Sequence, residues 1–186
     1  MNEQQQVVRT TAMDDSELRA QLEEHHSVSF GWALSCCGRN PMEAEDILQA
    51  AYLKVLNGQA RYGGDSQFKT WLFAVIRKTA AEERRRSWLR RLRLSRFSRE
   101  REGEVQSPTR GDGLEERERR QRLREALARL PRRQQEVLHL VFYQDLTVEE
   151  AAGVMGVSLG SARTHYERGK CRLGEWLKRS EHFDER

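Results

Sequence analysis

The sequence predicts an all-α protein built from two small helical domains, which a flexible linker joins. Apolar residues recur at helical spacing in both halves of the chain, and no alternating apolar–polar run favours a sheet. Between the halves lies the segment EGEVQSPTRGDG, which has glycines, a proline and no apolar period. A length of 186 residues suits one domain or two small ones. We therefore divide the chain into a disordered lead (1–13), an N-terminal domain (14–92), a basic flexible linker (93–120) and a C-terminal helix-turn-helix domain (121–183).

The composition argues against membrane insertion and favours a reducing compartment. No apolar run approaches the roughly 20 residues that a membrane span needs. The polar start MNEQQQVVRTTAMDD lacks the apolar core of a signal peptide. The cysteines number 3, which is odd, and the neighbours Cys36 and Cys37 are poorly placed to bridge each other. We therefore expect a cytoplasmic protein.

Two helices are expected in the first part of the N-terminal domain. Asp14, with Glu17 three residues later, can cap a helix that continues to Gly38. Its apolar positions are Leu18, Leu22, Val28, Trp32, Ala33 and Cys37. Asn40 caps the next helix, and Pro41 takes the first helical position, where a missing N–H costs nothing. In the stretch AEDILQAAYLKVL the apolar side holds Ile47, Leu48, Ala51, Tyr52 and Val55, while the polar side shows Asp46 and Gln49, with Lys54 near its edge.

A long third helix follows the turn-rich loop NGQARYGGDS, with Asp65 or Ser66 as its cap. Its apolar stripe consists of Phe68, Trp71, Leu72, Val75, Ile76 and Thr79. The opposite side carries Lys69, Phe73, Arg77 and Lys78. The helix then runs into a basic segment in which nine arginines fall between residues 84 and 101. This pattern predicts that Trp71 belongs to the core and that Phe73 is available to a ligand.

The C-terminal domain contains a candidate helix-turn-helix. A helical block begins near Leu114, and Pro131 starts a new helix, RRQQEVLHLVFYQD. Thr147 and Glu150 then form a capping box for a short helix with small apolar residues. Gly156 is expected to form a turn with positive φ, Val157 to pack into the core and Ser158 to cap the second helix.

The second helix of this unit has one face for packing and one for recognition. Its inner face holds Ala162, Tyr166, Gly169 and Leu173. Its outward face holds Gly160, Thr164, Glu167, Arg168 and Cys171, flanked by Ser161 and Arg163. Short polar groups beside arginines suit base edges and phosphates in a major groove. The alternative is an ordinary helical hairpin with a solvated face.

Taken in order, these stretches resemble the extracytoplasmic-function class of bacterial RNA polymerase sigma factors. AEDILQAAYLKVL resembles that family's helix that binds the polymerase clamp, and FKTWLFAVIRKTAAEERRR resembles its promoter-melting helix. The stretch from ALARLPRRQQEVLHLVFYQD through LTVEEAAGVMGVSLGSARTHYERGKCRL resembles its C-terminal promoter-reading domain. The order and spacing match, and the resemblance covers the chain from about Leu18 to Leu177.

The resemblance implies a role for each stretch. It implies that the C-terminal domain binds the −35 promoter element as duplex through Ser161, Arg163, Thr164, Glu167 and Arg168. It implies that the N-terminal domain captures melted −10 DNA through Tyr62, Ser66, Lys69, Thr70, Phe73, Arg77 and Lys78, with Arg84, Arg85 and Arg86 on duplex phosphates. Capturing unpaired bases needs a shaped or aromatic pocket and cations along the backbone. It also implies that core polymerase contacts Asp46, Gln49, Leu53 and Lys54, although the same four residues also suit a plain solvated face.

Other interpretations of the sequence are weaker. His25, His26, Cys36 and Cys37 lack ligand spacing for a metal, so we expect no metal and no cofactor. Cys171 fits a redox sensor less well than a plain exposed thiol. No phosphate loop or nucleophile motif indicates an enzyme or a small-molecule substrate.

Two rival functions stay open on the sequence alone. One is a stand-alone helix-turn-helix regulator, which would need a dimerisation helix that the sequence does not show. The other is a basic RNA-binding or structural protein, suggested by the arginine run. The expected partners are therefore core RNA polymerase, promoter DNA and, because family members are commonly held inactive, an anti-sigma factor.

Overall fold

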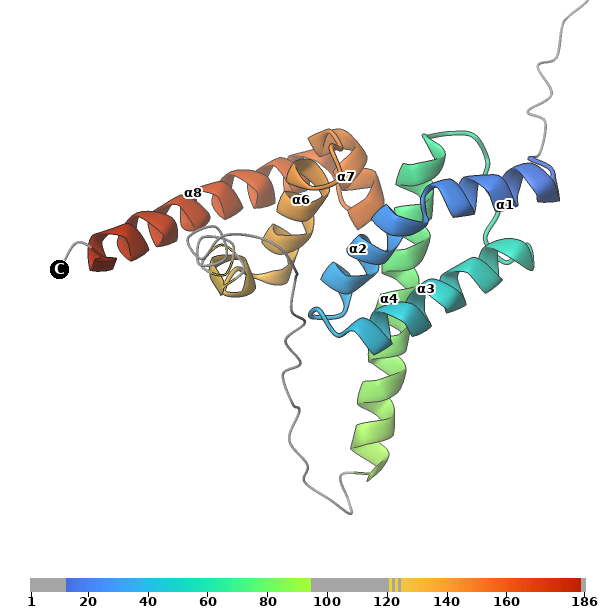
Figure 1. Cartoon of the computed structure of the whole chain (residues 1–186), viewed down its shortest axis with the longest axis horizontal. Coiled ribbons are helices and arrows are strands. Elements are labelled where there is room, and N and C mark those ends of the chain that lie inside the picture. The colour runs from blue at the N-terminus through green and yellow to red at the C-terminus, as the bar shows by residue number, and fades with distance from the viewer. Residues whose placement is uncertain (1–12, 95–120, 122, 124, 185–186) are drawn as a thin grey trace, which may run out of the picture.

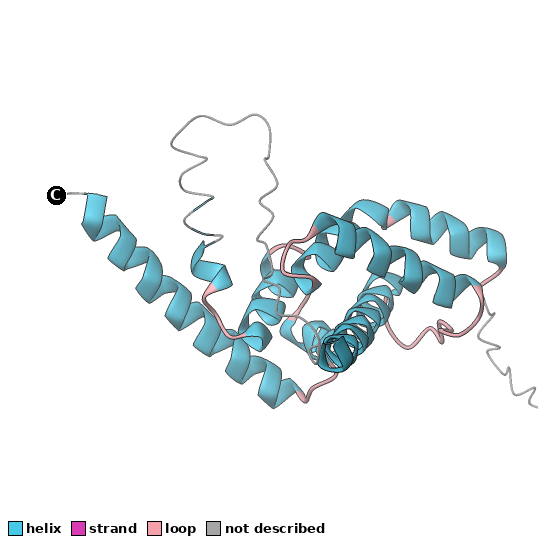
Figure 2. Ribbon diagram, turned by 90° about the horizontal axis from the view of Figure 1, so that it is seen from below, coloured by secondary structure: helices cyan, strands magenta, loops and turns pink. Residues whose placement is uncertain are grey.

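The computed structural model describes residues 13–94, 121, 123 and 125–184, and every regular element in this part of the chain is a helix (Figures 1 and 2). Helices α1 to α4 form a first lobe, and helices α6 to α8 form a second lobe. The expected disordered lead, except for its last residue, and most of the expected linker lie outside the described residues. The all-α prediction is confirmed.

The expected first helix is two helices, α1 (Asp15–Glu24) and α2 (His26–Cys36). Asp14 caps α1 as predicted, because its carboxylate accepts a 2.7 Å hydrogen bond from the backbone N–H of Glu17. The chain turns at His25, whose N–H bonds to the carbonyls at the end of α1. This turn shifts the helical phase of α2 relative to α1. As a result Val28 is 37% exposed, and Cys36 is buried in place of Cys37.

Helix α3 (Pro41–Leu56) forms as the sequence predicts. The Asn40 side chain accepts hydrogen bonds from the backbone N–H groups of Met42 and Glu43 at 3.1 and 3.3 Å. Pro41 occupies the first turn, where it breaks no helical hydrogen bond. The expected apolar side is buried against α2 and α4, with Tyr52 only partly covered.

Helix α4 (Phe68–Leu94) runs through the middle of the molecule, and its C-terminal part projects beyond the other helices (Figure 1). It packs against α2 and α3 on one side and against α7 on another. Because two sides of α4 are covered, its buried surface is wider than one stripe. Phe73 is 0% exposed, while Trp71 and Val75 are only partly buried. The prediction that Phe73 is free is therefore wrong, while Trp71 packs against the edge of the core and is only partly buried.

The second lobe consists of α6 (Arg132–Phe142), α7 (Val148–Met155) and α8 (Leu159–Asp184). Gly156 makes the predicted turn between α7 and α8 with φ +62°, a conformation that other residues adopt at a cost. Gly169 lets α8 cross α6 closely. A Cβ at this position would lie 3.1 Å from Leu138 Cδ1.

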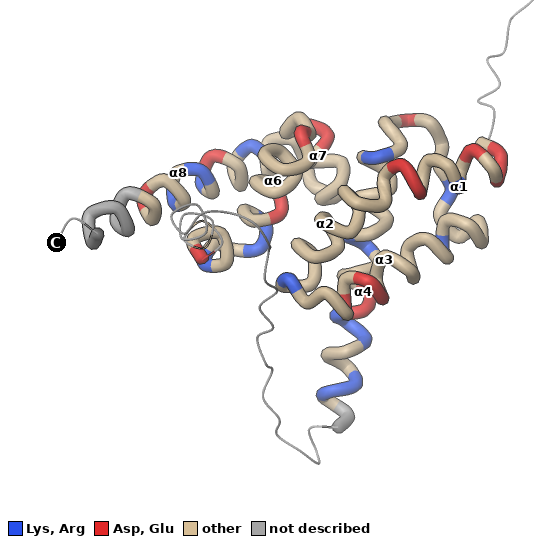
Figure 3. The backbone as a smooth tube through the Cα atoms, in the orientation of Figure 1, with Lys and Arg blue, Asp and Glu red and all other residues tan. Residues whose placement is uncertain are grey.

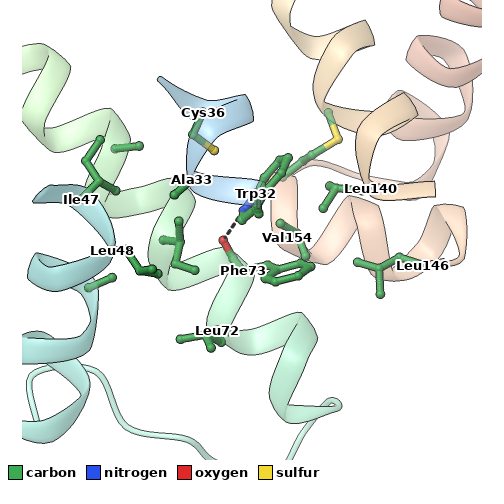
Figure 4. Close-up of a cluster of buried hydrophobic side chains, with 14 of the residues drawn as sticks. Trp32, Ala33, Cys36, Ile47, Leu48, Leu72, Phe73, Leu140, Leu146 and Val154 are labelled. Atoms are coloured by element: carbon green, nitrogen blue, oxygen red, sulfur yellow. Dashed lines mark hydrogen bonds between the residues drawn. The ribbon is translucent and has the colours of Figure 1, made fainter. Parts of the chain in front are cut away.

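The two lobes share one buried core. Trp32, Leu72, Phe73 and Ile76 from the first lobe belong to the same apolar cluster as residues of the second lobe, which are Val137, Leu140, Leu146, Ala151, Val154 and Met155 (Figure 4). The Trp32 ring lies between the rings of Phe73 and His139, with centroid distances of 6.0 and 5.4 Å. The lobes therefore pack directly on each other, which the expectation of a flexible linker did not include.

Candidate nucleic-acid interface

The second helix of the helix-turn-helix, the start of α8, presents its predicted outward face to solvent. The predicted recognition residues are exposed: Ser161, Arg163, Thr164, Glu167 and Arg168. On the opposite face, Ala162 and Gly169 are buried against the other helices of the second lobe. A polar, basic face of this kind has the chemistry for base edges and phosphates.

The caps of this unit form as the sequence predicts. Thr147 Oγ1 accepts a 3.2 Å hydrogen bond from the Glu150 N–H, and Glu150 Oε2 accepts a 2.8 Å bond from the Thr147 N–H. Ser158 Oγ accepts a 3.2 Å bond from the Ser161 N–H at the start of α8. These caps satisfy donors that would otherwise be orphaned at both helix starts, so they fix where the exposed face begins.

A second candidate surface lies at the start of α4 and in the loop before it. The rings of Tyr62, Phe68 and Trp71 form a cluster with centroid distances of 5.3 to 5.4 Å. The Tyr62 hydroxyl donates a hydrogen bond to the Ser66 carbonyl, which closes the loop over this cluster. Phe68 is buried, but Tyr62 and Trp71 are partly exposed. Trp71 is thus an aromatic group at the surface that the stripe pattern assigned to the core.

Four residues of the predicted melting surface lie under the second lobe. The Lys69 ammonium donates a 2.8 Å hydrogen bond to the Gln144 carbonyl, between α6 and α7. Arg77 Nε donates to Glu136 Oε2 at 3.2 Å. Thr70 and Phe73 are 5% and 0% exposed. In this arrangement the four side chains are unavailable to DNA, which is a correction to their expected exposure.

Glu136 is the centre of a charged cluster between the lobes. Its side chain is only 5% exposed, and its carboxylate lies within 3.4 Å of guanidinium nitrogens of Arg77, Arg132 and Arg133. Arg132 and Arg133 also donate to the carbonyls of Cys36 and Met155, at 3.4 and 3.2 Å. A carboxylate with little water around it needs such partners, because burying a lone charge is expensive.

The projecting part of α4 carries a basic surface (Figure 3). Lys78, Arg84, Arg85 and Arg86 are all exposed. Arg84 also donates a 2.9 Å hydrogen bond to the Cys36 carbonyl. Arg86 pairs with Glu83 at 2.6 Å. This end of α4 can therefore contact phosphates without any change in how the lobes pack.

The predicted polymerase-contact face on α3 is exposed except for one residue. Asp46 and Gln49 face solvent, and Leu53 is 54% exposed. Lys54 instead turns toward α4, where its ammonium contacts Glu82 Oε2 at 2.6 Å and Thr79 Oγ1 at 3.1 Å. The Lys54 hydrogen bond holds the pKa of Glu82 below its usual value. Lys54 is therefore already paired within the first lobe, unlike the other three predicted contact residues.

The cysteines offer no metal site and little reactive chemistry in the first lobe. Within the described residues, no group of three or more His, Cys, Asp or Glu side chains could hold a metal ion. Burial raises the pKa of Cys36 far above its usual value and that of Cys37 to about 12, so neither thiol ionises near neutral pH. Cys171 is exposed on α8.

No helix in the described part of the chain is long and apolar enough to cross a membrane.

Two family models match this chain, one on each lobe. Sigma-70 region 2 matches residues 22–90, and Sigma-70, region 4 matches residues 120–173. RNA polymerase sigma factor YlaC of Bacillus subtilis (strain 168) is 30% identical over 141 residues, which are 74% of this chain and 79% of that protein. The chain belongs to the sigma-70 family of RNA polymerase sigma factors.

Further comparisons agree on the family, through a second relative, and on the fold, through two solved structures. RNA polymerase sigma factor CarQ of Myxococcus xanthus is 30% identical over 139 residues, 75% of this chain and 77% of that protein. The sigma factor RpoE of Bartonella quintana, solved with the anti-sigma factor NepR, has a TM-score of 0.69 at 22% identity, over 88% of this chain and 98% of that one. CnrH, solved with the cytosolic domain of CnrY, has a TM-score of 0.60 at 19% identity, over 89% and 90%.

This protein is a sigma factor of the extracytoplasmic-function class. It directs promoter-specific initiation, and its partners are core RNA polymerase and promoter DNA.

Proposed function

We propose that the two lobes divide promoter recognition between them. The second lobe reads the −35 element as duplex through Ser161, Arg163, Thr164, Glu167 and Arg168. The observation that carries this assignment is the start of α8, where these five side chains are exposed while Ala162 and Gly169 hold the helix to its lobe. An exposed polar face with arginines, on the second helix of a capped helix-turn-helix, has the form that major-groove recognition requires.

The first lobe captures the melted −10 element. Tyr62, Ser66 and Lys78 supply a ring, a short polar group and a cation at the surface, and Lys69, Thr70, Phe73 and Arg77 join them when the second lobe leaves α4. Unstacking a base costs a few kcal/mol, and stacking it on an aromatic side chain returns roughly 1–3 kcal/mol. Trp71 joins this set because its ring is partly exposed beside Tyr62 at 5.3 Å. Arg84, Arg85 and Arg86 bind phosphates of the duplex beside the melted segment. The contribution of these contacts to the binding free energy depends on salt concentration and not on base sequence.

Core polymerase binds the exposed side of α3. Asp46, Gln49 and Leu53 form the contact, and Leu56, which is 40% exposed, extends its apolar part. An exposed leucine pair beside polar groups has the mixed composition of a protein interface. Lys54 positions α4 through Glu82 and contributes to the contact by holding α3 and α4 together.

The protein works in the cytoplasm as a specificity subunit, without catalysis of its own and without a cofactor. An anti-sigma factor holds it inactive. Supporting this partner, RpoE of Bartonella quintana was solved with the anti-sigma factor NepR. Co-purification from native cells before and after stress tests for this anti-sigma partner. Recovery of core polymerase alone in every condition would count against such a partner.

Reconstituted transcription tests the main proposal. Mapping the 5′ ends of transcripts after overexpression supplies a promoter, which is then transcribed by core polymerase with and without the purified protein. We expect a transcript only when the protein is present, and loss of that transcript in Arg163→Ala but not in Arg19→Ala, which changes an exposed arginine on α1. A footprint on palindromic half-sites without polymerase would favour a stand-alone regulator instead.

A further inference from the structure

The hydroxyl group of Thr164 is already bonded within its own helix. Thr164 lies on the exposed face at the start of α8, and its Oγ1 donates a 2.9 Å hydrogen bond to the carbonyl of Gly160, one turn earlier. A threonine hydroxyl carries a single hydrogen, so it cannot donate to a base while this bond holds. The groups that Thr164 still presents to a ligand are its methyl group and the lone pairs of Oγ1.

Gly160 leaves open space beside Thr164 on the same face of the helix. A Cβ at Gly160 would meet no heavy atom within 4 Å, whereas one at Gly169 would lie 3.1 Å from Leu138 Cδ1. Gly160 is helical and its φ is not positive, although glycine is a poor helix former compared with alanine. Neither the backbone conformation nor the packing of this chain therefore calls for glycine at this position. The close approach of a ligand would call for it.

The polar side chains on either side of Thr164 have partners of their own. Ser161 Oγ lies 2.9 Å from Ser158 Oγ at the cap of α8. Glu167 Oε2 lies 3.6 Å from Nζ of Lys170. Neither side chain takes the Thr164 hydroxyl as its partner, so the bond from Thr164 to Gly160 is undisturbed.

A methyl group on this face matches the edge of one base. Among the four bases, thymine alone presents a methyl group in the major groove, at C5. Guanine N7 and O6 accept hydrogen bonds, and the engaged hydroxyl of Thr164 has no hydrogen to give them. The amino groups of adenine and cytosine could donate to the lone pairs of Oγ1, but such a contact makes no use of the methyl group.

We propose that Thr164 reads a thymine of the −35 element through contact between its own methyl group and the C5 methyl group of the base. Gly160 provides the clearance that lets the base edge reach Thr164. The bond between the Thr164 hydroxyl and the Gly160 carbonyl keeps the methyl group available for this contact. The inference rests on the proposed role of the start of α8 in binding the −35 element.

Removal of single methyl groups from the DNA tests this contact. Core polymerase with the full-length protein is bound to duplexes of its mapped promoter, and each thymine of the −35 element is replaced in turn by deoxyuridine. Deoxyuridine pairs like thymine and lacks only the C5 methyl group. One replacement should lower the affinity roughly fourfold, the effect of leaving one methyl group unburied. An element without thymine on either strand, or the absence of an effect at every thymine, would overturn the proposal.

A matched pair of variants assigns the lost contact to Thr164. Thr164→Ser keeps the hydroxyl and removes the methyl group, so it should bind the natural promoter roughly fourfold more weakly and be indifferent to deoxyuridine. Thr164→Val removes the hydroxyl and keeps a methyl group, so it should remain sensitive to deoxyuridine. Thermal unfolding checks that both variants fold. Loss of affinity in Thr164→Val together with full affinity in Thr164→Ser would mean that the hydroxyl reads the base, and the proposal would be wrong.

A methylated cytosine provides a second readout at the same position. Replacing the thymine by cytosine should weaken binding, and 5-methylcytosine should bind roughly fourfold more tightly than cytosine because it restores the methyl group. Equal affinities for the two cytosine duplexes would contradict a methyl contact.

Gly160→Leu tests the clearance beside Thr164. Leucine fills the open space without touching the rest of the chain and is the better helix former, so the fold should be preserved. Promoter binding should nevertheless weaken by more than it does in Thr164→Ser. Affinity equal to that of the parent protein would exclude the proposed role of Gly160.

Arg163→Ala separates a failure of this proposal from a failure of the proposed function. If Arg163→Ala leaves the preference for the −35 sequence unchanged, then α8 does not read this element and the thymine contact falls with it. If Arg163→Ala relaxes that preference but deoxyuridine has no effect at any position, then the proposed function stands and the thymine contact alone is wrong.

Discussion

The indole N–H of Trp32 donates a 3.0 Å hydrogen bond to the backbone carbonyl of Phe73, and both side chains are fully buried (Figure 4). The bond ties α2 to the middle of α4. It also fixes the Trp32 ring against His139 of the second lobe. The Trp32 side chain therefore joins the packing of α2 on α4 within the first lobe to the contact between the two lobes.

Trp32→Phe should lower the free energy of unfolding by about 2 kcal/mol, because it leaves a small cavity and a buried carbonyl without its donor. Urea denaturation followed by circular dichroism measures the change. Trp88→Phe is the matched control, since Trp88 is 59% exposed on α4 and its replacement should change stability by less than about 0.5 kcal/mol. Similar losses in the two variants would mean that the Trp32 bond contributes little.

Gly169→Ala should destabilise the second lobe. The new Cβ would lie 3.1 Å from Leu138 Cδ1 and 3.3 Å from Gln134 Cβ, so these neighbours would have to shift by a few tenths of an ångström in a fully packed contact. Overpacking of this kind typically costs about 1–3 kcal/mol. Gly153→Ala in α7 is the control, because no heavy atom lies within 4 Å of its Cβ and alanine is the better helix former by about 1 kcal/mol. Thermal unfolding should show opposite signs for the two variants.

Acid should weaken the fold through His139. Burial, with a smaller contribution from Arg39, lowers the pKa of His139 from 6.5 to about 4. Between these two pKa values His139 is largely protonated in the unfolded chain and largely neutral in the folded chain. The free energy of unfolding should therefore fall as the pH drops from about 6.5 to about 4, by up to about 3 kcal/mol. His139→Phe keeps an aromatic ring beside Trp32 and should flatten this part of the pH profile, so an unchanged profile would exclude His139 as the cause.

The thiols should react in a fixed order. Cys171 is exposed, Cys36 is buried, and burial raises the pKa of Cys37 to about 12. A chromogenic disulfide reagent at pH 8 should therefore titrate a single thiol quickly in the native protein, and all 3 in denaturant. Cys171→Ser should abolish the fast phase. A fast phase that persists in this variant would place a reactive thiolate in the first lobe.

An arginine that reads bases and an arginine that contacts phosphates should differ in their effect on promoter affinity. Replacing the first should have an effect that depends on promoter sequence, and replacing the second an effect that depends on salt concentration. Arg163→Ala should cost holoenzyme about 1–3 kcal/mol on its own promoter and relax the preference at one base pair of the −35 element. Arg85→Ala should weaken all promoters alike and lower the slope of log affinity against log salt by about 1. Filter binding of holoenzyme to a set of single-base promoter variants at several salt concentrations checks both. Identical profiles would remove the distinction between base reading and phosphate contact.

The local features of this fold were predictable because they depend on nearest neighbours in sequence. The capping box of Thr147 and Glu150, the Asn40 cap and the Gly156 turn all formed where short-range chemistry places them. The exposure of the recognition residues followed from helical periodicity alone. Each of these signals involves residues that are at most a few positions apart.

The errors arose where distant segments meet. Phe73 was expected to be exposed because the one apolar stripe on α4 predicts only one buried side. Nothing in the local sequence pattern shows that α7 covers a second side of α4. Lys54 was expected on the outer face, but its partner Glu82 is 28 residues away. The break at His25 has no proline or glycine to mark it, and it moved the buried position from Cys37 to Cys36.

At the start of α8, the residues that pack within the lobe and the residues proposed to contact DNA lie on opposite faces of the helix. Ala162 and Gly169 hold the helix in place, while Arg163, Thr164 and Arg168 make no contact with the core. Substitutions on the outer face should therefore leave folding intact. This stretch of α8 suits stepwise divergence after gene duplication, in which a copy acquires a new set of target genes by exchanging a few surface residues. For the same reason it suits the construction of regulators that do not cross-react within one cell.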